Sequence, residues 1–182
     1  MSAWAGTLVF SGALFIEEYG ASARLTGVLL ATVAVAYLGG NAIGARIHHD
    51  CIRRALARGN VAAGASVALT WLLTPNVIVT LALFSFAAAV VAARTVVGTG
   101  YGFAVAGERK LEVGAARAAI THAGYLTGSF VGGAALAVGG HPAVGIAFGA
   151  LFLGATIPYL SAWAAHCARP GAVASLVRLS GA

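Results

Sequence analysis

The sequence predicts an all-α membrane protein that crosses the bilayer six times and forms one domain over residues 1–182. Hydrophobic residues make up 60% of the chain and charged residues 9%, whereas an ordinary soluble domain has roughly 25% charged residues. The 25 glycines agree with this, because small residues let membrane helices pack backbone to backbone.

Six apolar runs justify the six predicted transmembrane helices, because a bilayer core needs roughly 20 residues of helix. The runs cover residues 3–19, 25–45, 55–73, 77–105, 116–138 and 144–165. Short turns separate the third from the fourth at Pro75 and the fifth from the sixth at Pro142. The fourth run is longer than a straight span requires, so we expect it to tilt or to bend near Gly98 and Gly100.

The basic residues predict the orientation in the cytoplasmic membrane. Nine of the 11 Lys and Arg residues fall on one side of the six predicted spans: Arg46, Arg53, Arg54, Arg58, Arg109, Lys110, Arg117, Arg169 and Arg178. Loops rich in Lys and Arg stay in the cytoplasm, so both termini are expected there. A cleaved signal peptide ending near Ala23 is the competing interpretation, but residues 1–16 lack the basic start that such a peptide needs.

Three segments carry recognisable spacing. The loop after the second run begins at Gly44, contains Asp50 and ends with Arg53 and Arg54. The fourth run contains Arg94 followed by glycines at 98 and 100, and the fifth run has glycines at 124, 128, 132 and 133. The glycines four residues apart share one helix face, where a neighbouring helix can approach closely.

In order and position, these segments resemble three motifs of a six-helix half of the major facilitator superfamily. The loop is similar to G-x-x-x-D-R-x-G-R-R, with His48 at the Asp position. The fourth run is similar to R-x-x-Q-G-x-G, with Val97 at the Gln position. The fifth run is similar to G-x-x-x-G-P-x-x-G-G, with Ser129 at the Pro position. The pair of helix motifs resembles the antiporter branch, which exports solutes in exchange for protons.

The resemblance implies roles for several of these residues. The loop would lock helix ends together by charge pairing, or it would serve only as a basic topological anchor. Arg94 would take part in proton coupling, because an Arg inside a span is costly and has to face protein or water. The alternative is that Arg94 extends to the cytoplasmic interface as a packing anchor.

Two further titratable residues are candidates for a proton or substrate path. Glu17 ends the first run beside Glu18, and carboxylates inside membranes are natural proton carriers. Glu17 is also the partner that the predicted spans offer to Arg94 for proton coupling. The plainer interpretation places both in water at the outer interface. His122 begins the fifth run and either lies on a proton path or fills a packing position.

Several function classes are excluded by what the sequence lacks. Neither G-x-S-x-G nor H-E-x-x-H occurs, so we do not expect an enzyme. Adjacent His48 and His49 cannot converge on a metal as an i, i+4 pair does, so neither metal nor cofactor is expected. The net charge of +6 is spread over short loops rather than one face, which argues against nucleic acid as a partner.

The expected function is therefore secondary transport of a small solute by alternating access, with proton-coupled efflux as its form. In the resembling proteins the substrate site lies between two six-helix halves. The expected partners are thus the lipid bilayer, a small solute, protons and a second half, supplied by the same gene, another chain or a second copy. The alternative is a non-transporting membrane fragment or a packing partner in a membrane assembly.

Overall fold

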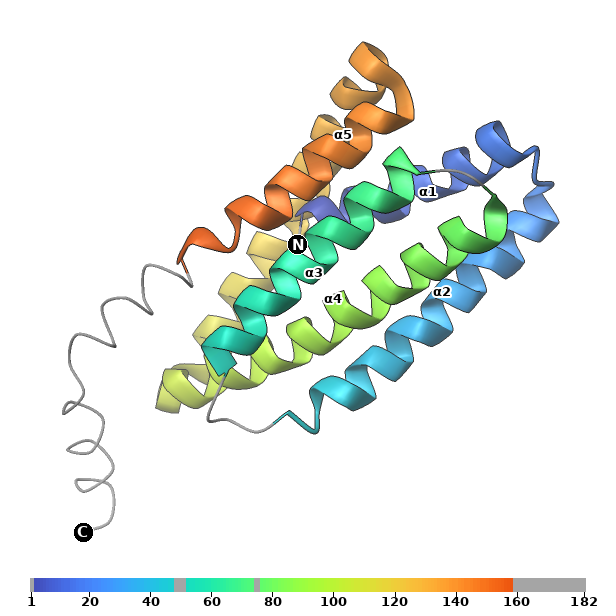
Figure 1. The fold of residues 1–182 in the computed structure, drawn as a ribbon. Helices are drawn as coiled ribbons and strands as arrows, with labels where there is room; N and C mark the ends of the chain where they lie inside the picture. Colours follow the sequence, from blue (N-terminus) through green and yellow to red (C-terminus); the bar gives the residue numbers. More distant parts are fainter. Residues whose placement is uncertain (1, 48–51, 74–75, 159–182) are drawn as a thin grey trace, which may run out of the picture.

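The computed structural model describes residues 2–47, 52–73 and 76–158. These residues form five α-helices and one short 3-10 helix (Figure 1): α1 (Ser2–Tyr19), α2 (Ala23–Gly44), α3 (Ile52–Leu72), α4 (Val77–Ala106), η2 (Gly107–Arg109) and α5 (Lys110–Gly154). Helices occupy the first four predicted ranges to within three residues at each end.

Local sequence signals explain where the helices begin and end. The Ser22 side chain accepts a hydrogen bond from Leu25 N at 3.3 Å and caps α2. The Asn76 side-chain Oδ1 accepts one from Val79 N at 2.9 Å and caps α4. Each cap satisfies a backbone N–H group that lacks a partner within its helix. Gly20, with φ +61°, ends the turn after α1 in a conformation that favours glycine.

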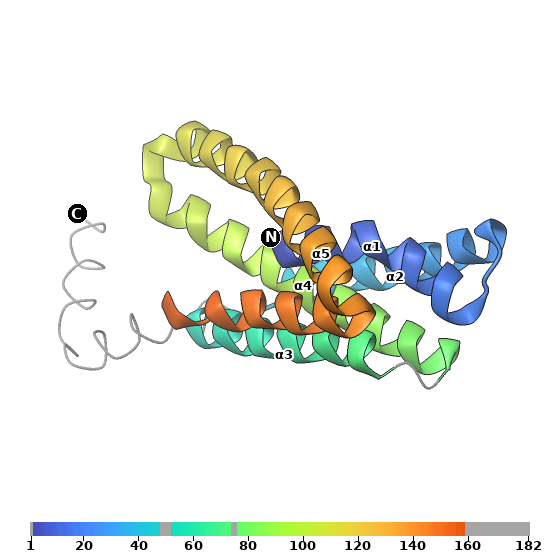
Figure 2. The same ribbon diagram turned by 90° about the horizontal axis from the view of Figure 1, so that it is seen from above.

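The long element α5 is divided by a break at Gly139 and Gly140. Gly140 has φ 64° and ψ −158°, a region that is open almost only to glycine, and Pro142 follows it. The break makes two arms, which we call the first arm (110–138) and the second arm (141–154). Figure 2 shows that they fold back in a hairpin, with the second arm running alongside α3.

Glycines allow the first arm to lie directly against α1. Gly124, Gly128 and Gly132 are buried. A Cβ atom added at Gly128 would overlap with the Ser2 carbonyl and lie 2.9 Å from Gly6 N. At Gly132, an added Cβ would collide with Phe10. The small residues therefore set the distance between these two helices.

The same device joins α2 to α4. A Cβ added at Gly40 would overlap with the Ala89 carbonyl, and one at Gly44 would come within 2.6 Å of the Ala93 carbonyl. In contrast, a Cβ at Gly39 would meet nothing within 4 Å. The second arm is also close to α3, because a Cβ at Gly145 would lie 2.6 Å from Trp71 Cβ.

The expectation of six transmembrane helices is wrong. The last two predicted spans belong to one element, α5, and residues beyond 158 lie outside the described part of the chain. Among the described residues, two stretches are long and apolar enough to cross a membrane, Ala23–Gly44 and Val77–Gly154. α1 is only 18 residues long and ends in two carboxylates, and α3 contains several arginines together with buried Asn60, which lowers its mean hydropathy.

The bundle buries polar side chains together with its apolar core, and it also exposes many large apolar side chains. Polar side chains are buried between the helices, namely Thr7, Ser11, Thr26, Asn60, Ser66, Thr70, Thr80, His141 and Thr156. Large apolar side chains are exposed on the outside, among them Val35, Leu38, Ile78, Val105, Leu111, Leu126, Phe130 and Val138. Soluble monomers rarely expose apolar patches of this extent, so this surface is suited to lipid or to a partner.

Candidate functional site

An apolar cavity of about 450 Å³ lies between α1, α2 and the first arm of α5. Its walls are formed by Trp4, Ala5, Leu8, Ser11, Leu30, Val33, Ala34, Tyr37, Leu38, Thr121 and Tyr125. We call it the aromatic chamber. Its volume falls in the range of sites for small organic ligands, about 300–1,000 Å³.

Aromatic rings stiffen one wall of the aromatic chamber. Trp4 stacks on Tyr37 with ring centroids 6.2 Å apart and planes at 17°, and its other neighbour is Phe84 at 5.7 Å. The Ser11 hydroxyl is engaged within its own helix, where it donates to Leu8 O at 2.8 Å. The chamber therefore offers mainly apolar surface, which suits an apolar or aromatic group.

A second cavity of about 370 Å³ lies between α3, α4 and the first arm. It is lined by Leu56, Arg94, Thr95, Gly98, Tyr101, Arg117, Ile120 and Thr121. We call it the arginine chamber, because two guanidinium-bearing residues line it and no acidic residue does within the described part of the chain. Thr121 lines both chambers, so the two adjoin at this residue.

Arg117 is held in the arginine chamber by neutral partners. Its Nη2 donates to the Thr99 hydroxyl at 2.6 Å, and its Nη1 donates to the Gly98 carbonyl at 3.5 Å. Neither acceptor carries a charge, so these contacts orient the guanidinium without neutralising it. Sequence reasoning had placed Arg117 only in a cytoplasmic loop. The spacing of four residues between Arg117 and Thr121 was the sequence signal that could have placed both on one helix face.

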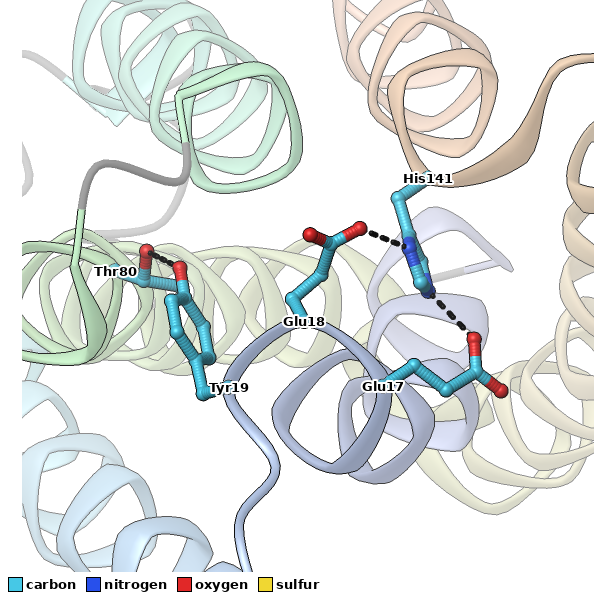
Figure 3. A network of polar contacts seen from close by, with 5 residues as sticks. All are labelled: Glu17, Glu18, Tyr19, Thr80 and His141. Atoms are coloured by element: carbon cyan, nitrogen blue, oxygen red, sulfur yellow. Dashed lines mark hydrogen bonds and ion pairs between the residues drawn. The ribbon is translucent and has the colours of Figure 1, made fainter.

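A polar cluster joins the end of α1 to the break in α5 (Figure 3). His141 Nδ1 lies 2.9 Å from Glu18 Oε1, and His141 Nε2 lies 3.4 Å from Glu17 Oε2. Only the Glu18 contact has hydrogen-bond geometry. The His141 side chain is 9% exposed, and its ring stacks on Trp71 at 5.7 Å. The cluster therefore places a buried imidazole between two carboxylates where α1 meets the break in α5.

The cluster is not arranged as a metal site. Within the described ranges, no group of three His, Cys, Asp or Glu side chains is placed to hold a metal ion. Next to the cluster, the Tyr19 hydroxyl lies 2.6 Å from the Thr80 hydroxyl and ties the end of α1 to the start of α4 (Figure 3). Sequence reasoning missed His141 as a partner of Glu17 and Glu18. The only hint in the sequence was that the turn after Glu18 and the turn containing His141 are both predicted on the outer side of the membrane.

The structure does not bring the predicted coupling residues together. Glu17 lies beside Tyr19, which contacts Thr80, whereas Arg94 follows Thr80 by 14 residues on a continuous helix. At 1.5 Å per residue this is a separation of about 21 Å along the axis. Arg94 is therefore close to Arg117 and not to Glu17, which the sequence had offered as its partner. His122 is exposed on α5, with its ring 6.5 Å from that of Tyr125.

The motif glycines have different surroundings. Gly98 lines the arginine chamber, and Gly133 has only the Phe10 ring near it, at 3.9 Å from an added Cβ. A Cβ at Gly100 would meet nothing within 4 Å. α4 continues as a helix through Gly98 and Gly100 to Ala106.

Only part of the predicted loop motif can be placed. Gly44 ends α2 against α4, and Arg54 is exposed near the start of α3. Arg53 belongs to α3 by its backbone. Asp50 lies outside the described residues, so the predicted charge pairing of this loop stays a prediction.

Comparison of the chain with models of protein families, with curated proteins and with solved structures found no match. The likeness to the major facilitator superfamily therefore stays a resemblance of three short segments. The two chambers and the polar cluster are the features of the molecule that bear on its function.

Proposed function

We propose that this chain is a multi-pass membrane protein that moves a small organic solute across the cytoplasmic membrane, driven by a proton gradient and in the direction of export. The observation that carries the proposal is the aromatic chamber, an open cavity of about 450 Å³ inside a helix bundle whose outer surface is apolar. An apolar groove of this size between helices is of the kind that takes up a small organic molecule.

The apolar exterior supports insertion into lipid. Leu111 and Val138 are each 90% exposed, and Phe130 is 79% exposed, all on α5. Exposing such side chains to water costs about 25 cal/mol per Å² of apolar surface, a cost that lipid removes. Several hydroxyls buried between the helices donate to backbone carbonyls one turn earlier, as Thr7 does to Ala3 O at 2.7 Å, and these hydroxyls need no water.

The proposed orientation follows from the two ends of the bundle. One end, which we call the His141 end, contains Glu17, Glu18, the Tyr19–Thr80 contact and His141. The opposite end contains the start of α3 with Arg54 and Arg58, and η2 with Arg109. The excess of basic residues at the opposite end supports a cytoplasmic location for that end, with the His141 end facing out.

The open side of the aromatic chamber supports a partner. Leu8, Leu38 and Tyr125 line it and are 40%, 66% and 46% exposed, so one wall of the chamber is missing in the single chain. In alternating access, the walls around a substrate site have to close in turn. In this proposal a second copy of the chain supplies the missing wall, so the purified chain can assemble the complete site.

The test is transport in proteoliposomes made with the purified chain. Two permanently charged aromatic probes of similar size, naphthalene-2-sulfonate and N-methylquinolinium, are offered with and without a pH gradient. We expect gradient-dependent movement of at least one probe, and its loss in Ala34→Trp, which fills the aromatic chamber from an exposed position. Fluxes of both probes equal to those of protein-free liposomes would overturn transport and favour the packing-partner alternative.

A further inference from the structure

We propose that the solute is an amphiphilic organic anion, whose carboxylate or sulfonate group binds between Arg94 and Arg117 while its apolar body fills the aromatic chamber. This inference rests on the proposed transport function and assigns its substrate class. It is drawn from the juxtaposition of two chambers of opposite character that share Thr121.

Arg117 gives the arginine chamber the positive charge that an anion requires. Arg94 and Arg117 come from different helices, α4 and the first arm of α5, and both are partly buried. The acceptors of Arg117 are a hydroxyl and a carbonyl, so its positive charge remains available to a ligand. A planar guanidinium matches the two oxygens of a carboxylate or sulfonate, and such charge-assisted bonds are roughly twice as strong as neutral ones.

The hydroxyls around the arginines are already committed as donors. Thr95 Oγ1 donates to Val91 O at 2.7 Å, and Thr121 Oγ1 donates to Arg117 O at 2.8 Å. These side chains cannot give the same protons to a ligand. Neither threonine therefore donates to the anionic group, and the charge of Arg117 recognises it.

The neighbouring aromatic chamber indicates the chemistry of the rest of the ligand. Its walls are aliphatic and aromatic, with Trp4 and Tyr37 stacked on one side. A free inorganic anion would leave this apolar volume unused. A one- or two-ring body attached to an anionic group would cover the apolar walls and reach the arginines past Thr121.

An acidic phospholipid has the same chemistry, because its phosphate is also an anion on an apolar body. The arginine chamber lies toward the basic end of the bundle, where such headgroups gather. The aromatic chamber favours the free solute, since its volume of about 450 Å³ matches a one- or two-ring body and aromatic rings form part of its walls. We therefore assign the site to a free solute, and the experiment includes a competition test with an acidic phospholipid.

The experiment measures binding of naphthalene-2-sulfonate by fluorescence anisotropy to the full chain in a neutral detergent. Arg94→Gln and Arg117→Gln should each weaken binding by roughly tenfold or more, as expected for loss of one charge-assisted bond. Arg109→Gln is the matched control, because it removes one charge from the exposed Arg109–Glu112 pair outside the chamber and should leave the affinity unchanged. N-methylquinolinium should bind at least tenfold more weakly than the sulfonate.

Two further binding experiments test the aromatic chamber and the arginine chamber separately. Ala34→Phe should weaken the binding of naphthalene-2-sulfonate, because the larger side chain fills part of the aromatic chamber. Methanesulfonate, which has no ring, should compete only weakly for binding in every variant. Adding phosphatidylglycerol to the micelles should displace little of the probe, whereas phosphatidylcholine serves as the uncharged reference. Strong displacement by phosphatidylglycerol alone would assign the arginine chamber to lipid and overturn the proposal.

The outcomes distinguish this inference from the transport proposal. Arginine-dependent binding without flux in proteoliposomes supports the site and overturns transport. Flux of N-methylquinolinium but not of the sulfonate supports transport and overturns the anion assignment. Normal binding by Arg94→Gln together with loss of gradient-driven flux would make Arg94 a coupling residue instead. If the Gln variants fail to fold, the affinities of the unmodified chain for the two probes test the anion assignment. Tighter binding of the sulfonate supports it, and equal or tighter binding of N-methylquinolinium overturns it.

Discussion

His141 Nδ1 lies 2.9 Å from Glu18 Oε1, although 123 positions separate the two residues in the chain. The contact connects the last turn of α1 to the break between the arms of α5, and Glu17 lies on the other side of the same imidazole. In the proposed transport this cluster is our candidate for the proton site, because it places an imidazole and two carboxylates at the junction of two helices that line the aromatic chamber.

Glu18→Gln should uncouple transport from the proton gradient without removing solute binding. The amide keeps the size of the carboxylate and can still accept a hydrogen bond from His141, but it cannot take up a proton. We expect gradient-driven flux of the transported probe to fall to the level seen without a gradient, with its affinity unchanged. Glu112→Gln, which alters an exposed pair with Arg109 near the other end, is the control. Normal gradient dependence in Glu18→Gln would leave the cluster with a structural role only.

Gly128→Leu should prevent the first arm from docking on α1. An added Cβ already overlaps with the backbone carbonyl of Ser2, which cannot move away as a flexible side chain can. Overpacking of this kind costs typically about 1–3 kcal/mol and occasionally more. Gly133→Leu is the matched control on the same helix, since its added Cβ comes no closer than 3.9 Å to Phe10. Equal yields of monodisperse protein for both variants on gel filtration would argue against close packing at Gly128.

Gly39→Ala and Gly40→Ala should change stability in opposite directions, although the residues are neighbours in α2. Replacing Gly by Ala in a helix gains up to about 1 kcal/mol of helix propensity. Nothing opposes this gain at Gly39, where no atom lies within 4 Å of an added Cβ, whereas at Gly40 the methyl would overlap with the Ala89 backbone. Thermal unfolding in detergent should give a higher midpoint for Gly39→Ala and a lower one for Gly40→Ala. A raised midpoint for both would mean that α2 and α4 are further apart.

Single cysteines should report opposite sides of the membrane at positions 24 and 54. Arg24 begins α2 near the His141 end, and Arg54 begins α3 at the opposite end. In a background with Cys51→Ser and Cys167→Ser, Arg24→Cys should react with an impermeant maleimide in intact cells. Arg54→Cys should react only after the membrane is opened. Strong labelling at position 54 in intact cells would reverse the proposed orientation.

The chain's local pattern was enough to predict the first four helices. Their ends lie within three residues of the predicted ranges, because helix formation and capping depend on nearby residues. It also predicted the small-residue face of Gly124, Gly128 and Gly132, since a spacing of four is a property of one helix. Counting six transmembrane spans failed, because helix formation by α1 and α3 does not require the hydropathy that crossing a membrane does.

Tertiary structure alone decided which polar residues meet. From the sequence, Glu17 was the partner offered to Arg94, whereas the structure places Glu17 with His141 and sets Arg94 and Arg117 around one cavity. Each choice depends on the rotation of a helix about its axis and on its register against its neighbours. Those quantities are determined by contacts such as Gly128 on Ser2 and Gly40 on Ala89, which join residues far apart in the chain. A sequence pattern gives the face of a helix, but only the packing of helix on helix determines what that face meets.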